Sequence, residues 1–108
     1  VEALLTESML AARRYGVEQV VLDSLSDLLP LPDWNATARY MISRSLEHGS
    51  RRAEEMREAA RTVAEAGVAP LMSDAIAKRQ DWAAGHRDAL SPDLAAMLDA
   101  ITETQDSR

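Results

Sequence analysis

The sequence contains no cysteine and no phenylalanine. Without cysteine, the chain can form neither disulfides nor thiolate metal sites, and it has no thiol nucleophile. The cysteine count therefore does not separate a reducing from an oxidising compartment. Aromatic residues make up only 4% of the chain, and alanine and leucine dominate the apolar residues. Small residues of high helix propensity favour helices that pack closely together.

Glycine, histidine and lysine are too sparse for several kinds of active site. Successive glycines lie at least 18 positions apart, so no closely spaced glycine loop for phosphate or dinucleotide exists. Two histidines, His48 and His86, do not indicate a metal site, and we expect no metal. We expect His86 at the surface beside Trp82, which anchors the core. The single lysine, Lys78, lies in a polar run, where a solvated side chain is a better interpretation than a reactive amine.

Positive charge is also in short supply, since 12 Lys and Arg face 18 Asp and Glu and give a net charge of -6. Nucleic-acid-binding proteins are usually basic, so nucleic acid is not an expected partner. No apolar run approaches the roughly 18 residues that a membrane span needs, and no signal-peptide pattern is visible. We therefore expect a cytoplasmic protein without a membrane partner.

The residues that are present suit one helical domain. The chain has 108 residues, of which 46% are hydrophobic, enough for one modest core. Prolines and glycines divide it into about six helices, and no segment has the pattern of a strand. Gly16 suits the end of the first helix, Asp33 the N-cap of the third and Ser91 the N-cap of the last. The fold class is all-α, with helices expected at about 1–15, 17–28, 34–46, 50–66, 70–82 and from 92 onward.

A violated helix rule marks the candidate site. Arg51 and Arg52 directly follow His48-Gly49-Ser50, which has the pattern of a helix start. The positive end of the helix dipole disfavours cations at that place. If the chain breaks at Gly49, then His48, Arg51 and Arg52 converge with the free N–H groups of a new helix. Such an arrangement binds carboxylate or phosphate.

Two alternatives stay open for this stretch. The helices on either side of Gly49 could be continuous, which places the arginines in mid-helix and removes the dipole argument. The charges could also form a solvated helix face, in which Arg51 pairs with Glu47 and Glu55 at a spacing of four residues. Each such pair contributes about 0.2–0.5 kcal/mol. Composition alone favours this solvated face.

The order of motifs resembles a known superfamily. A first helix carrying Glu7 and small residues ends in Gly16-Val17, and a short helix with a leucine ending follows. Residues 41–44, 48–56 and 66–72 add a more specific pattern. Over about residues 1–84 the chain resembles the C-terminal domain of the β-hydroxyacid dehydrogenase superfamily, in its 6-phosphogluconate dehydrogenase-like branch.

The resemblance implies that residues 1–108 form the C-terminal helical substrate and dimerisation domain of a two-domain enzyme. A Rossmann domain binding NAD or NADP, and the catalytic lysine, would lie upstream of Val1. The parent would be an NAD(P)-dependent oxidoreductase acting on a small hydroxy acid or related carbonyl compound. The chain alone would be inactive, with no catalytic residue of its own.

The resemblance also bears on the site. Many members carry a Lys-Asp-Leu motif facing nicotinamide and substrate, and Glu54-Glu55-Met56 stands in its place. Because Glu54 reverses the charge of the lysine, no contact is carried over to it. We predict that a small acidic substrate is bound by His48, Arg51, Arg52 and Glu55, the cations being inferred from their charge and not from a family motif.

Apolar residues spread around the first helix predict a partner subunit. Leu4, Leu5, Met9 and Leu10 lie on more than one face, as in a helix buried on two sides, so we expect a homodimer.

The alternative function is a stand-alone helical interaction or ligand-binding module without catalysis, because any helical bundle needs an Ala/Leu/Met-rich pattern.

Overall fold

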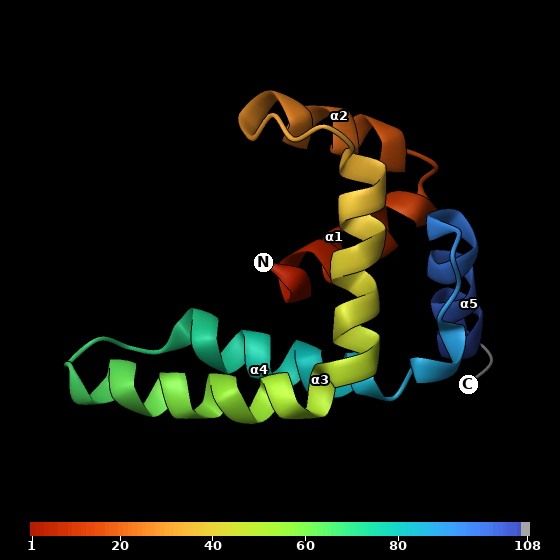
Figure 1. The fold of residues 1–108 in the computed structure, drawn as a ribbon. Coiled ribbons are helices and arrows are strands. Elements are labelled where there is room, and N and C mark those ends of the chain that lie inside the picture. Colours follow the sequence, from red (N-terminus) through yellow and green to blue (C-terminus); the bar gives the residue numbers. More distant parts are fainter. Residues whose placement is uncertain (107–108) are drawn as a thin grey trace.

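The computed structural model describes residues 1–106, with side chains as far as residue 103. Over this range every regular element is helical and none is a strand, which confirms the all-α prediction. Five α-helices and one short 3-10 helix are present in place of the six expected helices. They are α1 (Glu2–Arg14), α2 (Glu18–Leu28), α3 (Trp34–Glu65), α4 (Leu71–Ala84), η1 (Arg87–Ala89) and α5 (Leu94–Asp106), as Figure 1 shows.

Short-range sequence signals set the helix ends. The Asp33 carboxylate accepts a hydrogen bond of 3.0 Å from the Ala36 amide, as predicted for an N-cap. Gly16 takes a φ of 68°, the left-handed conformation expected after a helix. The prediction for Ser91 is wrong, because Asp93 accepts the capping hydrogen bond from the Ala96 amide at 2.9 Å. The last helix therefore begins at Leu94.

Helix α3 extends over 32 residues and includes the place where the sequence analysis expected a break. It bends at His48, whose φ of -122° and ψ of 16° are not helical. Figure 1 shows the two halves of α3 running in clearly different directions. The break that the sequence analysis expected near Gly49 is therefore present as a kink at His48, and both arginines lie in the half of α3 that follows the kink.

Gly49 has a packing role beside this bend. A Cβ atom at Gly49 would lie 2.3 Å from the backbone oxygen of Gln80 and 3.0 Å from the backbone nitrogen of Ala84. Real side chains do not fit at such distances. The absence of a side chain lets α3 and α4 touch backbone to backbone at this point.

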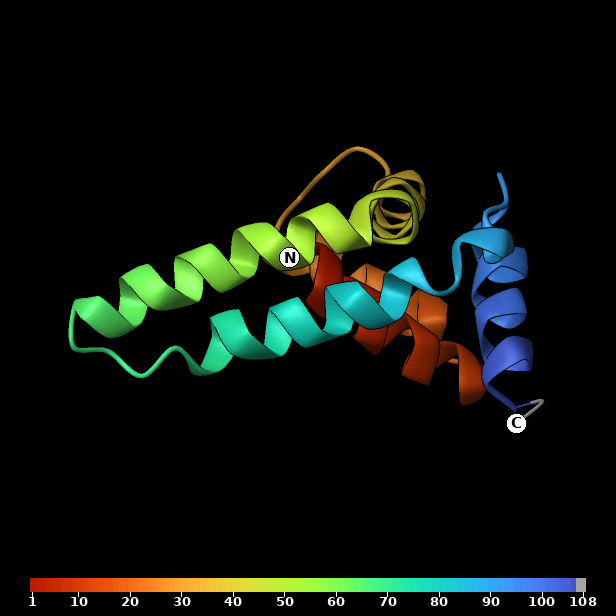
Figure 2. The same cartoon turned by 90° about the horizontal axis from the view of Figure 1, so that it is seen from below.

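The core lies mainly among α1, α2, α5 and the first half of α3, and Ala83 of α4 and Ala89 of η1 complete it. The second half of α3 runs beside α4 and forms a helical hairpin that projects from this body (Figure 2). The buried residues of the hairpin are mostly alanines, which permits close packing of its two helices. No helix within residues 1–106 combines the length and the apolar character needed to cross a membrane. The largest fully buried apolar side chains are Met9, Leu22, Ile42, Leu46, Met97, Leu98 and Ile101.

Candidate functional site

The four predicted binding residues all lie on α3, at and just after its bend, and the two arginines and the histidine among them lie beside carboxylates. Arg51 Nη1 donates to Glu55 Oε1 at 2.7 Å, and both side chains are more than half exposed. His48 Nε2 lies 3.6 Å from a Glu47 carboxylate oxygen. The solvated-face interpretation therefore describes Arg51 well, although its partner in the structure is Glu55 and not Glu47.

Arg52 and Glu55 line a hollow of about 400 Å³ among α1, α3 and α4, which we call the α1–α3–α4 hollow. The structure thus brings together two of the four predicted residues, while His48 and Arg51 do not line it. The remaining lining residues come from the start of α1, from α3 and from α4. The full lining is Val1, Glu2, Met41, Arg52, Glu55, Met56, Ile76 and Gln80.

An ion pair sits inside this hollow. Arg52 Nε lies 3.0 Å from Glu2 Oε1, with only 25% and 19% of the two side chains exposed. The buried Nε–H nevertheless has no hydrogen-bond partner of acceptable geometry. Charge pairing and hydrogen bonding are separate requirements, and only the first is met here. An anion that approaches Arg52 must therefore compete with the Glu2 carboxylate.

Gln80 is one of the six residues lining the hollow that the sequence analysis missed. Its side chain is only 4% exposed, and its Oε1 atom has no hydrogen-bond partner. An unsatisfied buried acceptor costs about 1–3 kcal/mol, so such groups are rare in folded proteins. No local pattern could reveal Gln80 or Glu2, because both reach the hollow only through the packing of α1 and α4 on α3.

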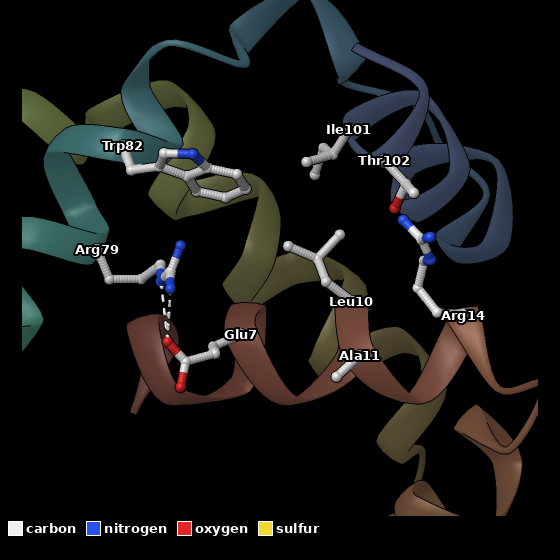
Figure 3. Close-up of a pocket in the computed structure, with 8 residues that line it drawn as sticks. All are labelled: Glu7, Leu10, Ala11, Arg14, Arg79, Trp82, Ile101 and Thr102. Atoms are coloured by element: carbon white, nitrogen blue, oxygen red, sulfur yellow. Dashed lines mark hydrogen bonds and ion pairs between the residues drawn. The ribbon is translucent and has the colours of Figure 1, made fainter. Parts of the chain in front are cut away.

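A second hollow, of about 260 Å³, lies among α1, α4 and α5 (Figure 3). There Arg79 donates to Glu7 Oε1 at 2.7 and 3.1 Å, and its guanidinium lies 4.8 Å from the centre of the Trp82 ring. His86 is only 5% exposed and its ring centre lies 4.3 Å from that of Trp82, so the expected surface position of His86 is wrong. Arg79 thus contacts both Glu7 and Trp82, and its hydrogen bonds to Glu7 join α1 to α4. Because these groups already satisfy one another, we take the α1–α3–α4 hollow as the candidate site. Other residues lining the second hollow are Leu10, Ala11, Arg14, Ile101 and Thr102.

The candidate site offers hydrogen-bonding and charged groups but no metal centre. Over residues 1–106, no group of three or more His, Cys, Asp or Glu side chains is placed to hold a metal ion. The site's formal charges are one arginine and two carboxylates, Glu2 and Glu55. It can bind a ligand that supplies hydrogen-bond donors to its carboxylate and amide oxygens and an acceptor to Arg52.

Comparison with known proteins gives a family and one structural relative. Residues 12–83 match the family described as "Domain of unknown function (DUF1932)". The crystal structure of a conserved hypothetical protein from Sinorhizobium meliloti 1021 is similar, with a TM-score of 0.78 and 35% sequence identity. The similarity covers 94% of this chain but only 36% of that protein, so this chain spans little more than a third of its relative. Among curated proteins, none matches the chain.

Proposed function

We propose a function for this chain from the premise that it belongs to the DUF1932 family. In this proposal it is the C-terminal, substrate-side and dimerisation domain of a cytoplasmic NAD(P)-dependent oxidoreductase. The parent enzyme acts on a small hydroxy acid or a related carbonyl compound. By itself, the domain has no activity.

The position of the candidate site is the observation that carries the proposal. Val1 and Glu2, at the start of α1, line the same hollow as Arg52 and Glu55. A domain that precedes Val1 would therefore join this one at the rim of the hollow. If the resemblance to hydroxyacid dehydrogenases holds, a catalytic lysine just before Val1 would lie near this rim. The greater length of the Sinorhizobium relative leaves room for such a domain.

The nicotinamide cofactor does not fit within this chain alone, because the sequence has no closely spaced glycines to cradle its phosphates. Hydride chemistry would come from a nucleotide held mainly by another domain. The described residues would provide the wall of the substrate site. Arg52 would exchange Glu2 for the acid group of the substrate, and Glu55 would face the reacting groups, as the acidic residue of the family motif does. Fixed charges on such a wall orient a substrate before reaction.

We also propose a homodimer, although fewer apolar residues of α1 are free to form it than the sequence indicated. Leu5 and Met9 are buried in the chain's own core, and Leu10 packs against it. Leu4, in contrast, is 61% exposed, and it borders a small hollow together with Met72 of α4, which is 71% exposed. Apolar side chains that meet at the surface mark a contact with another protein surface.

The direct test is to purify the full-length protein that contains this chain and to follow NADH and NADPH absorbance with a panel of small hydroxy and oxo acids. We expect turnover with at least one pair, and a dinucleotide-binding glycine motif upstream of Val1. A full-length protein without a nucleotide-binding domain would overturn the proposal in favour of a non-catalytic module.

Replacing Arg52 in the full-length enzyme tests the role of the hollow. Arg52→Ala removes a charged donor to the substrate, so we expect KM to rise roughly 10- to 100-fold. Arg61→Ala is the matched control, because Arg61 lies on the same helix, is 61% exposed and pairs with Glu58. Steady-state kinetics provides the measurement. Equal KM values for the two variants would remove Arg52 from the substrate site.

A further inference from the structure

The unsatisfied amide of Gln80 points to the chemistry of the ligand that the α1–α3–α4 hollow takes. Gln80 lines the hollow, is 4% exposed and leaves Oε1 without a hydrogen-bond partner. The backbone of Gln80 is closely packed, because α3 and α4 meet where its carbonyl oxygen faces Gly49. A ligand that carries a hydrogen-bond donor would supply the partner that Oε1 lacks.

The atom that lacks a partner defines the complementary group. An amide oxygen accepts hydrogen bonds, so the ligand must present a donor such as a hydroxyl or an amino group. The same hollow holds the Arg52 Nε–H, which also lacks a hydrogen-bond partner and lies beside the Glu2 carboxylate. One donor and one acceptor thus remain unsatisfied among the residues lining one hollow.

We propose that Gln80 is a specificity-determining residue whose Oε1 accepts a hydrogen bond from a hydroxyl group of the bound ligand, while Arg52 binds its acid group. The inference deepens the proposed function, on which it rests for the choice of a hydroxy acid. Gln80 then discriminates against an acid of the same size that lacks the hydroxyl, because that acid leaves Oε1 buried and unpaired. The free energy that the unpaired Oε1 atom costs the free protein is regained when the ligand donates a hydrogen bond to it.

The experiment titrates the 108-residue chain with three four-carbon acids while its backbone amide resonances are followed by NMR. L-Threonate carries hydroxyl groups, butanoate carries none, and 2-aminobutanoate carries an amino group. We expect threonate to shift resonances of residues lining the hollow and to bind about tenfold more tightly than butanoate. Equal affinities for threonate and butanoate, or no shift with threonate, would overturn the inference. Tighter binding of 2-aminobutanoate would overturn the assignment of a hydroxyl.

Gln80→Met provides the matched variant, since it keeps the length of the side chain and removes the acceptor. It should abolish the preference for threonate and raise the melting temperature of the free chain, because an unsatisfied buried polar group is lost. A glutamine with a purely structural role would give a lower melting temperature and an unchanged preference. Gln19→Met is the control, because Gln19 is exposed on α2 and lies outside the hollow.

The inference and the proposed function can fail separately. The titration needs neither nicotinamide nor a second domain, so selective threonate binding that depends on Gln80 would stand even if the full-length protein were not an oxidoreductase. An active hydroxy-acid oxidoreductase whose substrate preference is unchanged by Gln80→Met would retain the proposed function and remove the role of Gln80.

Discussion

At the scale of single residues, Gly49 has a role in helix packing that its sequence context does not indicate. Glycine after a histidine and before a serine and two arginines has the pattern of a helix boundary. In the structure it directly follows the kink of α3 at His48, and the space that a Cβ would need is filled by the backbone of α4. The sequence alone could predict a special role for Gly49. It could not predict that Gly49 packs against the backbone of Gln80 and Ala84, which lie about 30 positions further along the chain.

Gly49→Ala should destabilise the fold. The new methyl group would lie 2.3 Å from the Gln80 carbonyl oxygen, so α3 and α4 must move apart. We expect a loss of about 1–3 kcal/mol in the free energy of unfolding, as for other overpacked sites. Urea unfolding followed by circular dichroism measures it. Ser50→Ala, at the exposed neighbouring position, should change stability little, and the prediction fails if both variants unfold alike.

At the scale of helices, one arginine joins three of them. Arg13 of α1 forms a two-pronged hydrogen bond with Asp99 of α5, at 2.9 and 3.0 Å, and donates to Glu18 of α2 at 2.6 Å. Arg13 lowers the pKa of Asp99 from its ordinary 3.8. The pKa of Glu18 is lowered from 4.5, first by the backbone N–H of Glu18 itself and then by Arg13. Both carboxylates are therefore better stabilised as anions in the folded chain.

Lowered carboxylate pKa values make this junction sensitive to acid. Groups of this kind stabilise the fold above their unfolded pKa, and their contribution disappears as the pH falls through the lowered folded value. We expect the unfolding free energy to fall as the pH drops below about 4.5, and Asp99→Asn to make this fall less steep. Because 47% of the Asp99 side chain is exposed, solvent screens the pair and the effect should shrink with salt. Unfolding curves at several pH values test this against Asp27→Asn, an exposed control that should keep the slope of the parent chain.

Most elements could be predicted from local signals, and the site could be predicted only in part. Helix ends at Asp33 and Gly16 follow from capping and from the left-handed conformation, which depend on a few neighbouring residues. The kink near Gly49 was also expected from the local sequence, whereas the lining of the hollow depends on contacts between distant helices. Arg52 and Glu55 were predicted from charge and family resemblance, whereas their neighbours Glu2 and Gln80 come from other helices and carry no signal of their own.

At the scale of the whole molecule, apolar side chains remain uncovered on the hairpin and on the adjoining end of α1. Leu4, Leu71 and Met72 are between 61% and 75% exposed. A second copy of the chain that covers Leu4 and Met72 is the partner we expect.

Sedimentation velocity tests the dimer. The chain should sediment as a dimer at micromolar concentration, and Leu4→Lys combined with Met72→Lys should weaken association roughly tenfold or more. Both residues are exposed, so circular dichroism should show unchanged helix content. Val20→Lys on α2, where Val20 is 63% exposed, is the control and should leave the dimer intact. A monomer in the parent chain would contradict the prediction.

The bent helix α3 has one more consequence. The first half of α3 belongs to the core and its second half to the hairpin, so the bend at His48 joins the two parts along α3 without a loop between them. Arg52 and Gln80 both lie on the hairpin, whereas Glu2, which lines the same hollow, lies on α1. A rotation at the bend would therefore change the distance of Arg52 and Gln80 from Glu2, and with it the width of the hollow.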